Sequence, residues 1–270
     1  MRLYSIAVYL FLYVPIGIIV LFSFNSGRHA SDFVGLSTKW YGKALSNPFV
    51  MEAFTTSLII ALSAAFLSSI MGTAAALALQ RVRGPMKVMF DSLIYVSIMI
   101  PGIVIGIATL VALVTVFDLI NPVLASLWPE GTKAPKLALG YTSVIAAHTL
   151  FTMSLVIVLV RARISGMDRS LIEASEDLYA SPWRTFYQIT LPQISPAVLA
   201  GFLLSFTFSF DDFIIAFFVA GANTTLPIYV FASIRRGITP EVNVIGTMVL
   251  GISLTLLIIA QVLLQRRDQR

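Results

Sequence analysis

Two adjacent acidic residues, Asp211 and Asp212, interrupt a long apolar stretch and offer the clearest chemistry in this sequence. Carboxylates attract cations, and the neighbouring rings of Phe210, Phe213 and Tyr229 could each add about 0.5–2 kcal/mol to the binding of an ammonium group. Adjacent helical residues point about 100° apart. We therefore predict that one aspartate lines a path for a cationic solute, with Phe210 and Tyr229 beside it, and that the other pairs with a neighbouring helix or subunit. Alternatively, the pair simply ends a helix at the membrane interface.

The composition indicates which kind of protein surrounds these carboxylates. Of 270 residues, 58% are hydrophobic and 11% are charged, whereas a soluble domain has about 25% charged residues. The chain is therefore predicted to be a polytopic, all-helical integral membrane protein. Cys is absent and there are two His, so disulfides and thiolate metal sites are excluded and no metal or other cofactor is expected in this chain. The net charge of +5 fits a membrane topology better than nucleic-acid binding.

Charge-free runs long enough to cross a bilayer, which takes roughly 20 helical residues, give the expected spans. Six such runs lie within residues 2–28, 52–81, 91–118, 136–161, 184–211 and 241–266. The segment 213–234 contains Gly221 and Pro227, which break helices. We expect the fifth helix to pass through the aspartates to about Ala220, followed by a short helix or loop at the outer surface. With both termini cytoplasmic, most Lys and Arg residues lie inside.

Small residues and one Pro-Gly pair predict how the helices pack. Four small side chains recur every four residues in the second run and form a face for close helix packing: Ala64, Ser68, Gly72 and Ala76. Pro101-Gly102 predicts a break in the third run, forming a hinge or a cavity wall. His148 in the fourth run is predicted to be a hydrogen-bonded structural residue.

The polar stretch 161–192 separates the fourth and fifth runs. Ser170 and Glu173 have the spacing of a capping box, and we expect a short helix over 171–180. The alternative is an amphipathic helix resting on lipid headgroups.

A second short helix is predicted directly after the first. Ser181 is suited to cap it and Pro182 to occupy its first position. We expect it to end near Ile189, before Leu191-Pro192. The two helices would form a rigid knob on the cytoplasmic side.

This stretch resembles the EAA loop of bacterial ABC-importer permeases. The matching residues are Glu173-Ala174-Ser175, Tyr179-Ala180-Ser181-Pro182, Phe186, Ile189 and Leu191-Pro192. Ser175 replaces an Ala of the family pattern and Tyr179 replaces a Gly that permits a tight bend. The resemblance implies a coupling helix that docks on a cytoplasmic ATP-binding subunit. Glu173 would cap the first helix and pair with a basic group, Ala174 would allow close approach, and Tyr179 to Pro182 would form the tip.

A wider resemblance covers nearly all of the chain. Four segments resemble the second permease of spermidine/putrescine importers: Trp40-Tyr41-Gly42, Ser209 to Asp212, Thr225-Leu226-Pro227 and Gly237 to Asn243. It implies the six-helix core of type I importers, with residues 1–270 as one permease domain in the bacterial inner membrane. The implied partners are a second permease, an ATPase dimer that binds ATP and Mg, and a periplasmic substrate-binding protein. The implied function is polyamine import by alternating access.

Three alternatives stay open at this stage. The same importer class carries other organic solutes, including opine-like, amino-acid-derived and phosphonate compounds. A channel or secondary transporter would leave the cytoplasmic helix pair unexplained. A membrane-embedded enzyme would need a reactive constellation, and the sequence provides none, so no catalytic residues are predicted. The chain also lacks a Gly-x-x-x-x-Gly-Lys-Ser/Thr phosphate loop, so ATP hydrolysis is assigned to a separate subunit.

Overall fold

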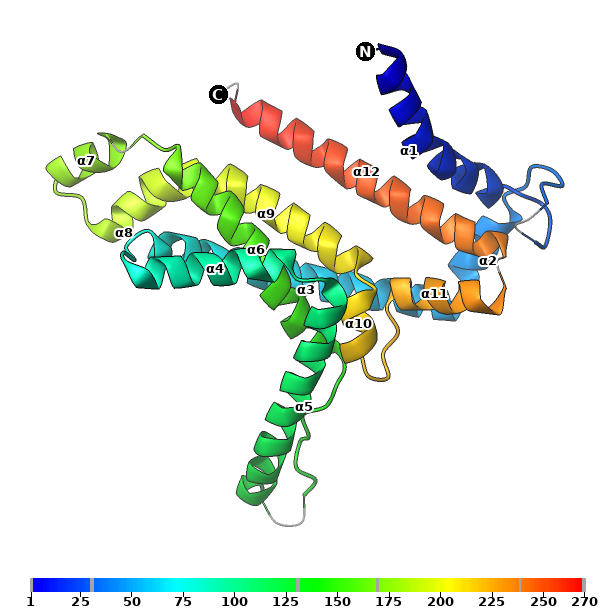
Figure 1. Ribbon diagram of the computed structural model, residues 1–270, viewed down its shortest axis with the longest axis horizontal. Coiled ribbons are helices and arrows are strands. Elements are labelled where there is room, and N and C mark those ends of the chain that lie inside the picture. Colours follow the sequence, from blue (N-terminus) through cyan, green and yellow to red (C-terminus); the bar gives the residue numbers. More distant parts are fainter. Residues whose placement is uncertain (1, 30–31, 130–131, 169, 238, 269–270) are drawn as a thin grey trace. The chain divides into compact units, whose positions relative to one another are not determined.

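The computed structural model describes residues 2–29, 32–129, 132–168, 170–237 and 239–268. Their regular structure is helical, apart from a single bridge between Asn25 and Leu36. The helices, labelled in Figure 1, are α1 (Arg2–Ser23), α2 (Lys39–Ser46), α3 (Pro48–Leu79), α4 (Pro85–Met99), α5 (Gly102–Leu127), α6 (Tyr141–Ser165), α7 (Ser170–Asp177), α8 (Pro182–Thr185), the π-helical turn η1 (Phe186–Thr190), α9 (Leu191–Asp211), α10 (Ile214–Val219), α11 (Leu226–Arg236) and α12 (Pro240–Asp268). Ile238, within the segment Gly237 to Asn243, lies outside the described residues.

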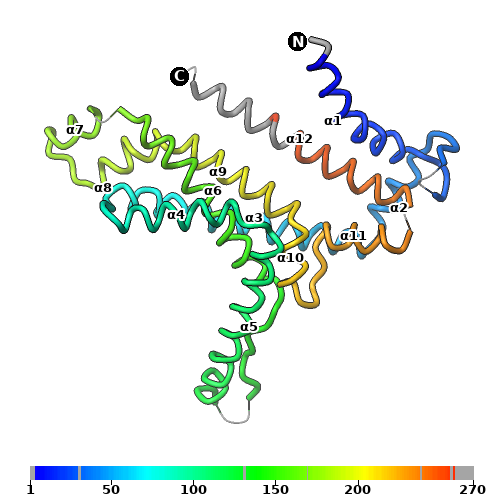
Figure 2. The backbone as a smooth tube through the Cα atoms, in the orientation of Figure 1, coloured from blue at the N-terminus to red at the C-terminus, as the bar shows by residue number. Residues whose placement is uncertain are grey.

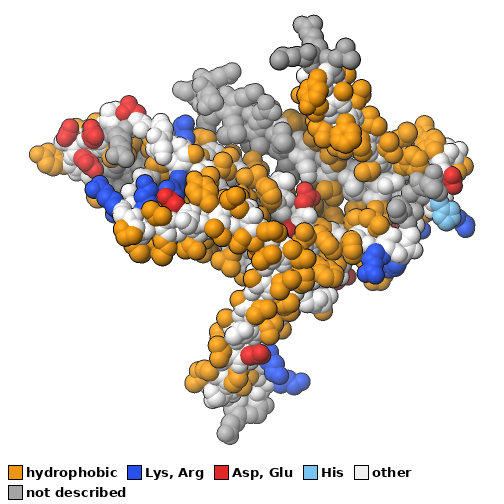
Figure 3. Space-filling view, in the orientation of Figure 1, with side chains coloured by type: hydrophobic (Ala, Val, Ile, Leu, Met, Phe, Trp, Pro, Cys, Tyr) orange, Lys and Arg blue, Asp and Glu red, His pale blue; other side chains and the backbone are white. Residues whose placement is uncertain are grey.

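Five helical segments are long and apolar enough to cross a membrane: Tyr4–Ser23, Pro48–Leu79, Gly102–Leu127, Tyr141–Ser165 and Pro182–Asp211. A further apolar helix, Pro240–Thr255, forms the first part of α12. Hydrophobic side chains cover much of α4 and α5 in the space-filling view, while charged side chains gather around α7 and α8 (Figure 3). The prediction of an all-helical chain with apolar spans is confirmed.

The third apolar run is interrupted where Pro101-Gly102 predicted a break. Helix α4 ends at Met99, Ile100 is extended (ψ 134°), and α5 begins at Gly102. The tube changes direction at this point (Figure 2). The predicted limits of this span were wrong: Asp91 lies within α4, and α5 continues beyond Asp118 to Leu127.

The described chain divides into two compact units. The first comprises residues 1–55 and 226–270, and in it α1 lies beside α12. Trp40 of α2 packs in a small core with Ala44 and Val244, and its indole Nε1 donates to the carbonyl of Gly27 (3.0 Å).

The second unit, residues 56–225, contains the small-residue face predicted on α3. A Cβ added to Gly72 would lie 2.7 Å from Cβ of Val156 on α6, and Ser68 Oγ lies 2.6 Å from Thr152 Oγ1. A Cβ added to Gly201 of α9 would lie 3.3 Å from both γ-carbons of Val156. Because glycines on α3 and α9 face the same valine, both helices approach α6 closely. The packing role predicted for this face is confirmed.

The predicted course of the fifth helix was wrong at both ends. At its start, residues 182–211 form one continuous helix rather than a short helix ending near Ile189. The N–H of Leu191 donates to the carbonyl of Phe186, five residues earlier. This π-type turn lets the helix continue through Pro192, which lies in the first turn of α9, where a missing N–H is tolerated.

At its other end, the fifth helix stops at Asp211 instead of reaching Ala220. Asp212 is extended (φ −69°, ψ 120°), and the short helix α10 begins at Ile214. Residues 209–220 contain neither Gly nor Pro, so no helix-breaking residue marks this break. Asp212 supplies an acceptor for the N–H of Ala216 (3.0 Å), near the start of α10.

Candidate functional site

Asp211 and Asp212 lie on opposite sides of a helix end. Asp211 is the last residue of α9 and its side chain is exposed. Asp212 is the first residue beyond the helix and is half-buried. Phe210, predicted to lie beside a substrate path, is buried instead, with 6% of its surface exposed. The two carboxylates therefore have different surroundings, although they are adjacent in sequence.

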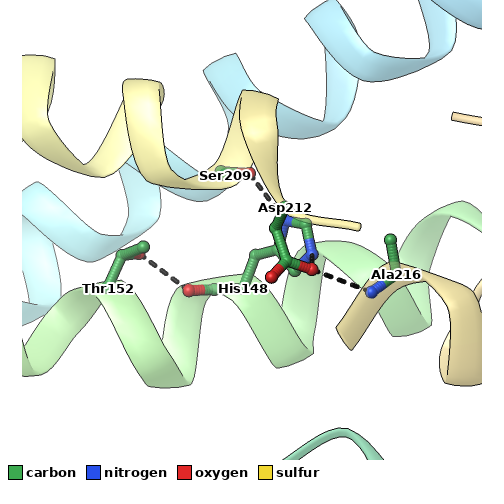
Figure 4. A network of polar contacts seen from close by, with 5 residues as sticks. All are labelled: His148, Thr152, Ser209, Asp212 and Ala216. Carbon is green, nitrogen blue, oxygen red and sulfur yellow. Dashed lines mark hydrogen bonds and ion pairs between the residues drawn. The ribbon is translucent and has the colours of Figure 1, made fainter. Parts of the chain in front are cut away.

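Asp212 joins a polar network between α9, α10 and α6 (Figure 4). Its Oδ2 accepts a hydrogen bond from the backbone N–H of Ala216 (3.0 Å) and lies 3.3 Å from Nε2 of His148. The other ring nitrogen, Nδ1, lies 2.7 Å from Ser209 Oγ. His148 is almost fully buried, and its carbonyl accepts from Thr152 Oγ1 (2.7 Å).

The sequence predicted a hydrogen-bonded His148 but not its contact with Asp212. One signal could have found this contact. Polar side chains within apolar spans pair with one another because each would otherwise be costly in the membrane. His148 and Asp212 occupy consecutive apolar runs, so pairing them was a testable expectation.

Tyr229, the remaining residue predicted for the path, belongs to α11 in the first unit. Its hydroxyl accepts a hydrogen bond from Asn47 Nδ2 (3.3 Å), and the same amide nitrogen donates to Glu241 Oε1 (2.8 Å). These contacts join the starts of α11, α3 and α12. Tyr229 therefore takes part in hydrogen bonds that hold helices together.

The loop between α6 and α9 forms a compact pair of short helices. Helix α7 begins at Ser170, one residue before the predicted start, so Ser170 lies within the helix and not before it. Its N–H donates to Asp168 Oδ1 (2.9 Å), and hydrogen bonds from Ser170 hold the pKa of Asp168 below its usual range. Asp168 takes over the role of accepting a helix-start N–H.

Tyr179 lies at the bend between the two helices. Its φ is +58°, in the left-handed region that favours glycine. The N–H of Ala180 donates to the carbonyl of Ser175, and that of Tyr179 to the carbonyl of Glu176. This bonding pattern is the Schellman motif, in which the residue at the left-handed position is usually Gly. The Tyr therefore adopts the backbone geometry expected of the Gly it replaces.

One side-chain contact joins α7 to α8, and a cap defines the start of α8. Ser175 Oγ lies 2.8 Å from Thr185 Oγ1, and both residues are buried. Ser181 caps α8, as predicted, by accepting from the N–H of Arg184 (3.4 Å), with Pro182 at the first helical position. The result is a rigid helix pair built largely from its own contacts.

The tip of this helix pair presents apolar side chains to solvent. Leu178 is 82% exposed, Tyr179 97% and Trp183 70%. Glu173 and Ala174 are also exposed on α7. Large exposed apolar groups on a polar loop are typical of a protein interaction site. Across the described residues, no cluster of three or more His, Cys, Asp or Glu side chains could hold a metal ion.

Long apolar helices combined with an exposed helix pair define the class of a transporter permease. One solved structure, of a bacterial ABC transporter involved in the import of the acidic polysaccharide alginate, superposes with a TM-score of 0.76. The match covers 98% of this chain and 94% of that chain at 15% identity. At this identity the likeness shows the fold alone.

Sequence relatives define the family. The chain is 38% identical over 245 residues to the putrescine transport system permease protein PotI of Escherichia coli K12, covering 89% of this chain and 82% of PotI. It is 33% identical over 266 residues to the spermidine/putrescine transport system permease protein PotC of Haemophilus influenzae, covering 98% and 96%. Residues 66–270 match the family of binding-protein-dependent transport system inner membrane components. The chain belongs to this family and is a permease subunit of an ABC importer.

Proposed function

We propose that this permease moves polyamines, such as putrescine and spermidine, from the periplasm to the cytoplasm. Its similarity to PotI and PotC over most of the chain supports this substrate class. Polyamines carry several ammonium groups, and a carboxylate in a low-dielectric path attracts them far more strongly than one in water.

We assign the path carboxylate to Asp211. The observation that carries this assignment is the difference between the two aspartates. Asp212 is engaged by Ala216 and His148, whereas Asp211 ends α9 with an exposed side chain. An exposed carboxylate within an apolar chain is available to a passing cation. Phe210 and Tyr229 have less direct roles, since one is buried and the other bonds to Asn47.

The chain acts as one permease domain with six spans and both termini in the cytoplasm. Apolar helix α12 supplies the sixth span. Because the chain contains no Cys, single cysteines report its topology without background. A membrane-impermeant thiol reagent should label Lys39→Cys and Lys133→Cys in intact cells but not Glu176→Cys. Labelling of Glu176→Cys from outside would contradict this topology.

The segment 161–192 couples the permease to a separate ATPase dimer that binds ATP and Mg. The exposed Glu173 and Ala174, together with the tip at Tyr179 to Pro182, form the docking surface, and Ser175 fixes α7 on α8. A rigid helix pair can pass nucleotide-driven movement to α6 and α9 as one body. A second permease and a periplasmic substrate-binding protein complete the complex.

Whole-cell uptake of labelled putrescine and spermidine tests the proposed function. Asp211→Asn keeps the shape of the side chain and removes its charge, so uptake should fall at least about tenfold at an unchanged membrane level of the complex. Asp118→Asn, on an exposed aspartate of α5, is the matched control and should retain uptake. Asp212→Asn should reduce uptake less. Wild-type uptake in Asp211→Asn would contradict the path role, and uptake of neutral or anionic solutes instead of polyamines would contradict the substrate class.

A further inference from the structure

We propose that His148 is a positioning residue: it holds the break between α9 and α10 against α6 and so fixes the direction in which Asp211 points. This inference rests on the proposed role of Asp211 in polyamine transport. It assigns a task to a buried histidine that neither the family resemblance nor the path proposal uses.

The break between α9 and α10 combines a contact within the segment with contacts from α6. Residues 209–220 contain no Gly or Pro, so no helix-breaking residue marks its position. The start of a new helix leaves backbone N–H groups without partners. Asp212 supplies one replacement by accepting from the N–H of Ala216, which requires its carboxylate to stay at the start of α10.

Side chains of α6 make polar contacts at both ends of α10. At the start of α10, His148 contacts Ser209 (2.7 Å) and Asp212 (3.3 Å). At its end, Ser143 Oγ donates to the carbonyl of Val219 (2.7 Å). Ser143 and His148 are each 2% exposed. The segment from Ser209 to Val219 is therefore attached to α6 by three polar contacts from two buried residues.

Helix α5 closes the other side of α10. A Cβ added to Gly106 would lie 2.7 Å from Cδ2 of Phe218 and 3.4 Å from Cα of Ile215. A Cβ at Gly102, which directly follows the α4–α5 break, would lie 3.9 Å from Ile214. The start of α5 therefore lies beside the start of α10, and α10 packs against both α5 and α6. Interrupted helices of this kind are tolerated in membranes where they are packed in protein or line a cavity.

Imidazole suits this position because its two ring nitrogens serve two different partners. Nδ1 lies 2.7 Å from the Ser209 hydroxyl, while Nε2 lies 3.3 Å from Oδ2 of Asp212, so one ring contacts both sides of the break. Without the ring, Asp212 loses its lateral partner and α9 can extend through residues 212–216. The extension would redirect the backbone after Asp211 and move its carboxylate relative to the path.

Substitution of His148 by Asn or by Gln tests its contacts with Ser209 and Asp212 separately. Asn at position 148 reaches about as far as Nδ1 and can keep the Ser209 contact, whereas Gln reaches about as far as Nε2 and can keep the Asp212 contact. We expect His148→Ala and His148→Asn to raise the KM for putrescine uptake about tenfold, with the complex at its normal membrane level. His148→Gln should restore the KM to within about threefold of wild type. The control is His29→Ala, at the exposed second histidine of the chain.

A second readout does not depend on polyamine transport. In the cysteine-free chain, a thiol probe at Ile214→Cys, an exposed position beside the break, should react at a rate that changes at least about threefold in His148→Ala and returns in His148→Gln. Wild-type KM and labelling in His148→Ala would overturn the proposal. Equal losses in the Ala, Asn and Gln variants with a reduced amount of complex would also overturn it, because they indicate packing alone. If the wild type takes up no polyamine, the proposed function fails, while the labelling still decides whether His148 holds the break.

Discussion

At the scale of single residues, Tyr179 shows how a departure from a family pattern can leave the backbone unchanged. The Schellman hydrogen bonds require a left-handed residue after α7, and Tyr179 takes that conformation at φ +58°. For a residue with a Cβ this costs roughly 1–2 kcal/mol. The ring itself is 97% exposed and is available to a partner subunit.

Replacing Tyr179 separates two effects: the strain of the left-handed backbone and the contribution of the exposed ring to ATPase binding. Tyr179→Gly should relieve about 1 kcal/mol of strain, and Tyr179→Ala should not. Amide hydrogen exchange along α7 should therefore be slower in the Gly variant than in the Ala variant. Both variants lack the ring, so both should bind the ATPase more weakly if the ring contacts it. Faster exchange in the Gly variant would contradict the assignment of strain to this bend.

At the scale of helices, close packing in the second unit depends on the absence of side chains. Gly72 of α3 and Gly201 of α9 both face Val156 of α6. Contact of this kind replaces the hydrophobic driving force that is missing between helices in lipid. The same three helices carry the polar contacts of Ser68, Thr152 and His148.

Gly72→Ala should disturb this packing. The new Cβ would lie 2.7 Å from Cβ of Val156, and overpacking typically costs about 1–3 kcal/mol. We expect a lower melting temperature of the purified complex. Gly251→Ala is the matched control, because nothing lies within 4 Å of a Cβ there. Adding Val156→Ala to Gly72→Ala should recover part of the loss; no recovery would contradict a direct clash.

The short helices of the segment 161–192 give a second prediction at this scale. Glu173→Lys reverses an exposed charge on α7 and should weaken ATPase binding by about 2–5 kcal/mol if Glu173 pairs with a basic group there. Uptake should be lost while the permease stays folded in the membrane. The control Glu52→Lys makes the same charge change at an exposed residue of α3. Normal ATPase binding and uptake in Glu173→Lys would remove the coupling role.

The sequence predicted those elements whose cause is local. Small residues at positions 64, 68, 72 and 76 repeat along one helix face, and Pro101 lacks the N–H that a helix needs, so the packing face and the α4–α5 break were both predictable. The break at Asp212 was not, because no Gly or Pro marks it and the contact of Asp212 with His148 joins two different helices. The π-type turn before Pro192 and the left-handed Tyr179 were missed for a related reason, since both conformations are uncommon for their residues.

For the candidate site, the sequence singled out the two aspartates but did not predict which of them contacts a neighbouring helix. It predicted that Asp211 and Asp212 would play different roles, on the basis of their directions along an unbroken helix. In the structure the difference comes from the end of that helix, which leaves Asp211 exposed and turns Asp212 toward α6. Only the packing of α6 against α9 could reveal which aspartate has a partner.

At the scale of the whole molecule, much of the apolar surface of the described residues is exposed. None of the most apolar window of α1 is buried, and only 6% of that of α5 is. Lipid and partner subunits are the surroundings that suit such faces. This agrees with membership of a family of inner membrane components, which work within larger complexes. The central claim therefore concerns the assembled importer.

Transport by the reconstituted complex tests that claim most directly. The permease, its partner permease and the ATPase are placed in liposomes with ATP inside, and the substrate-binding protein and labelled putrescine are supplied outside. We predict uptake that stops when either ATP or the binding protein is omitted, and that falls at least about tenfold with Asp211→Asn. Putrescine entry that continues without ATP, or a complete complex that imports a neutral solute and excludes putrescine, would contradict the account.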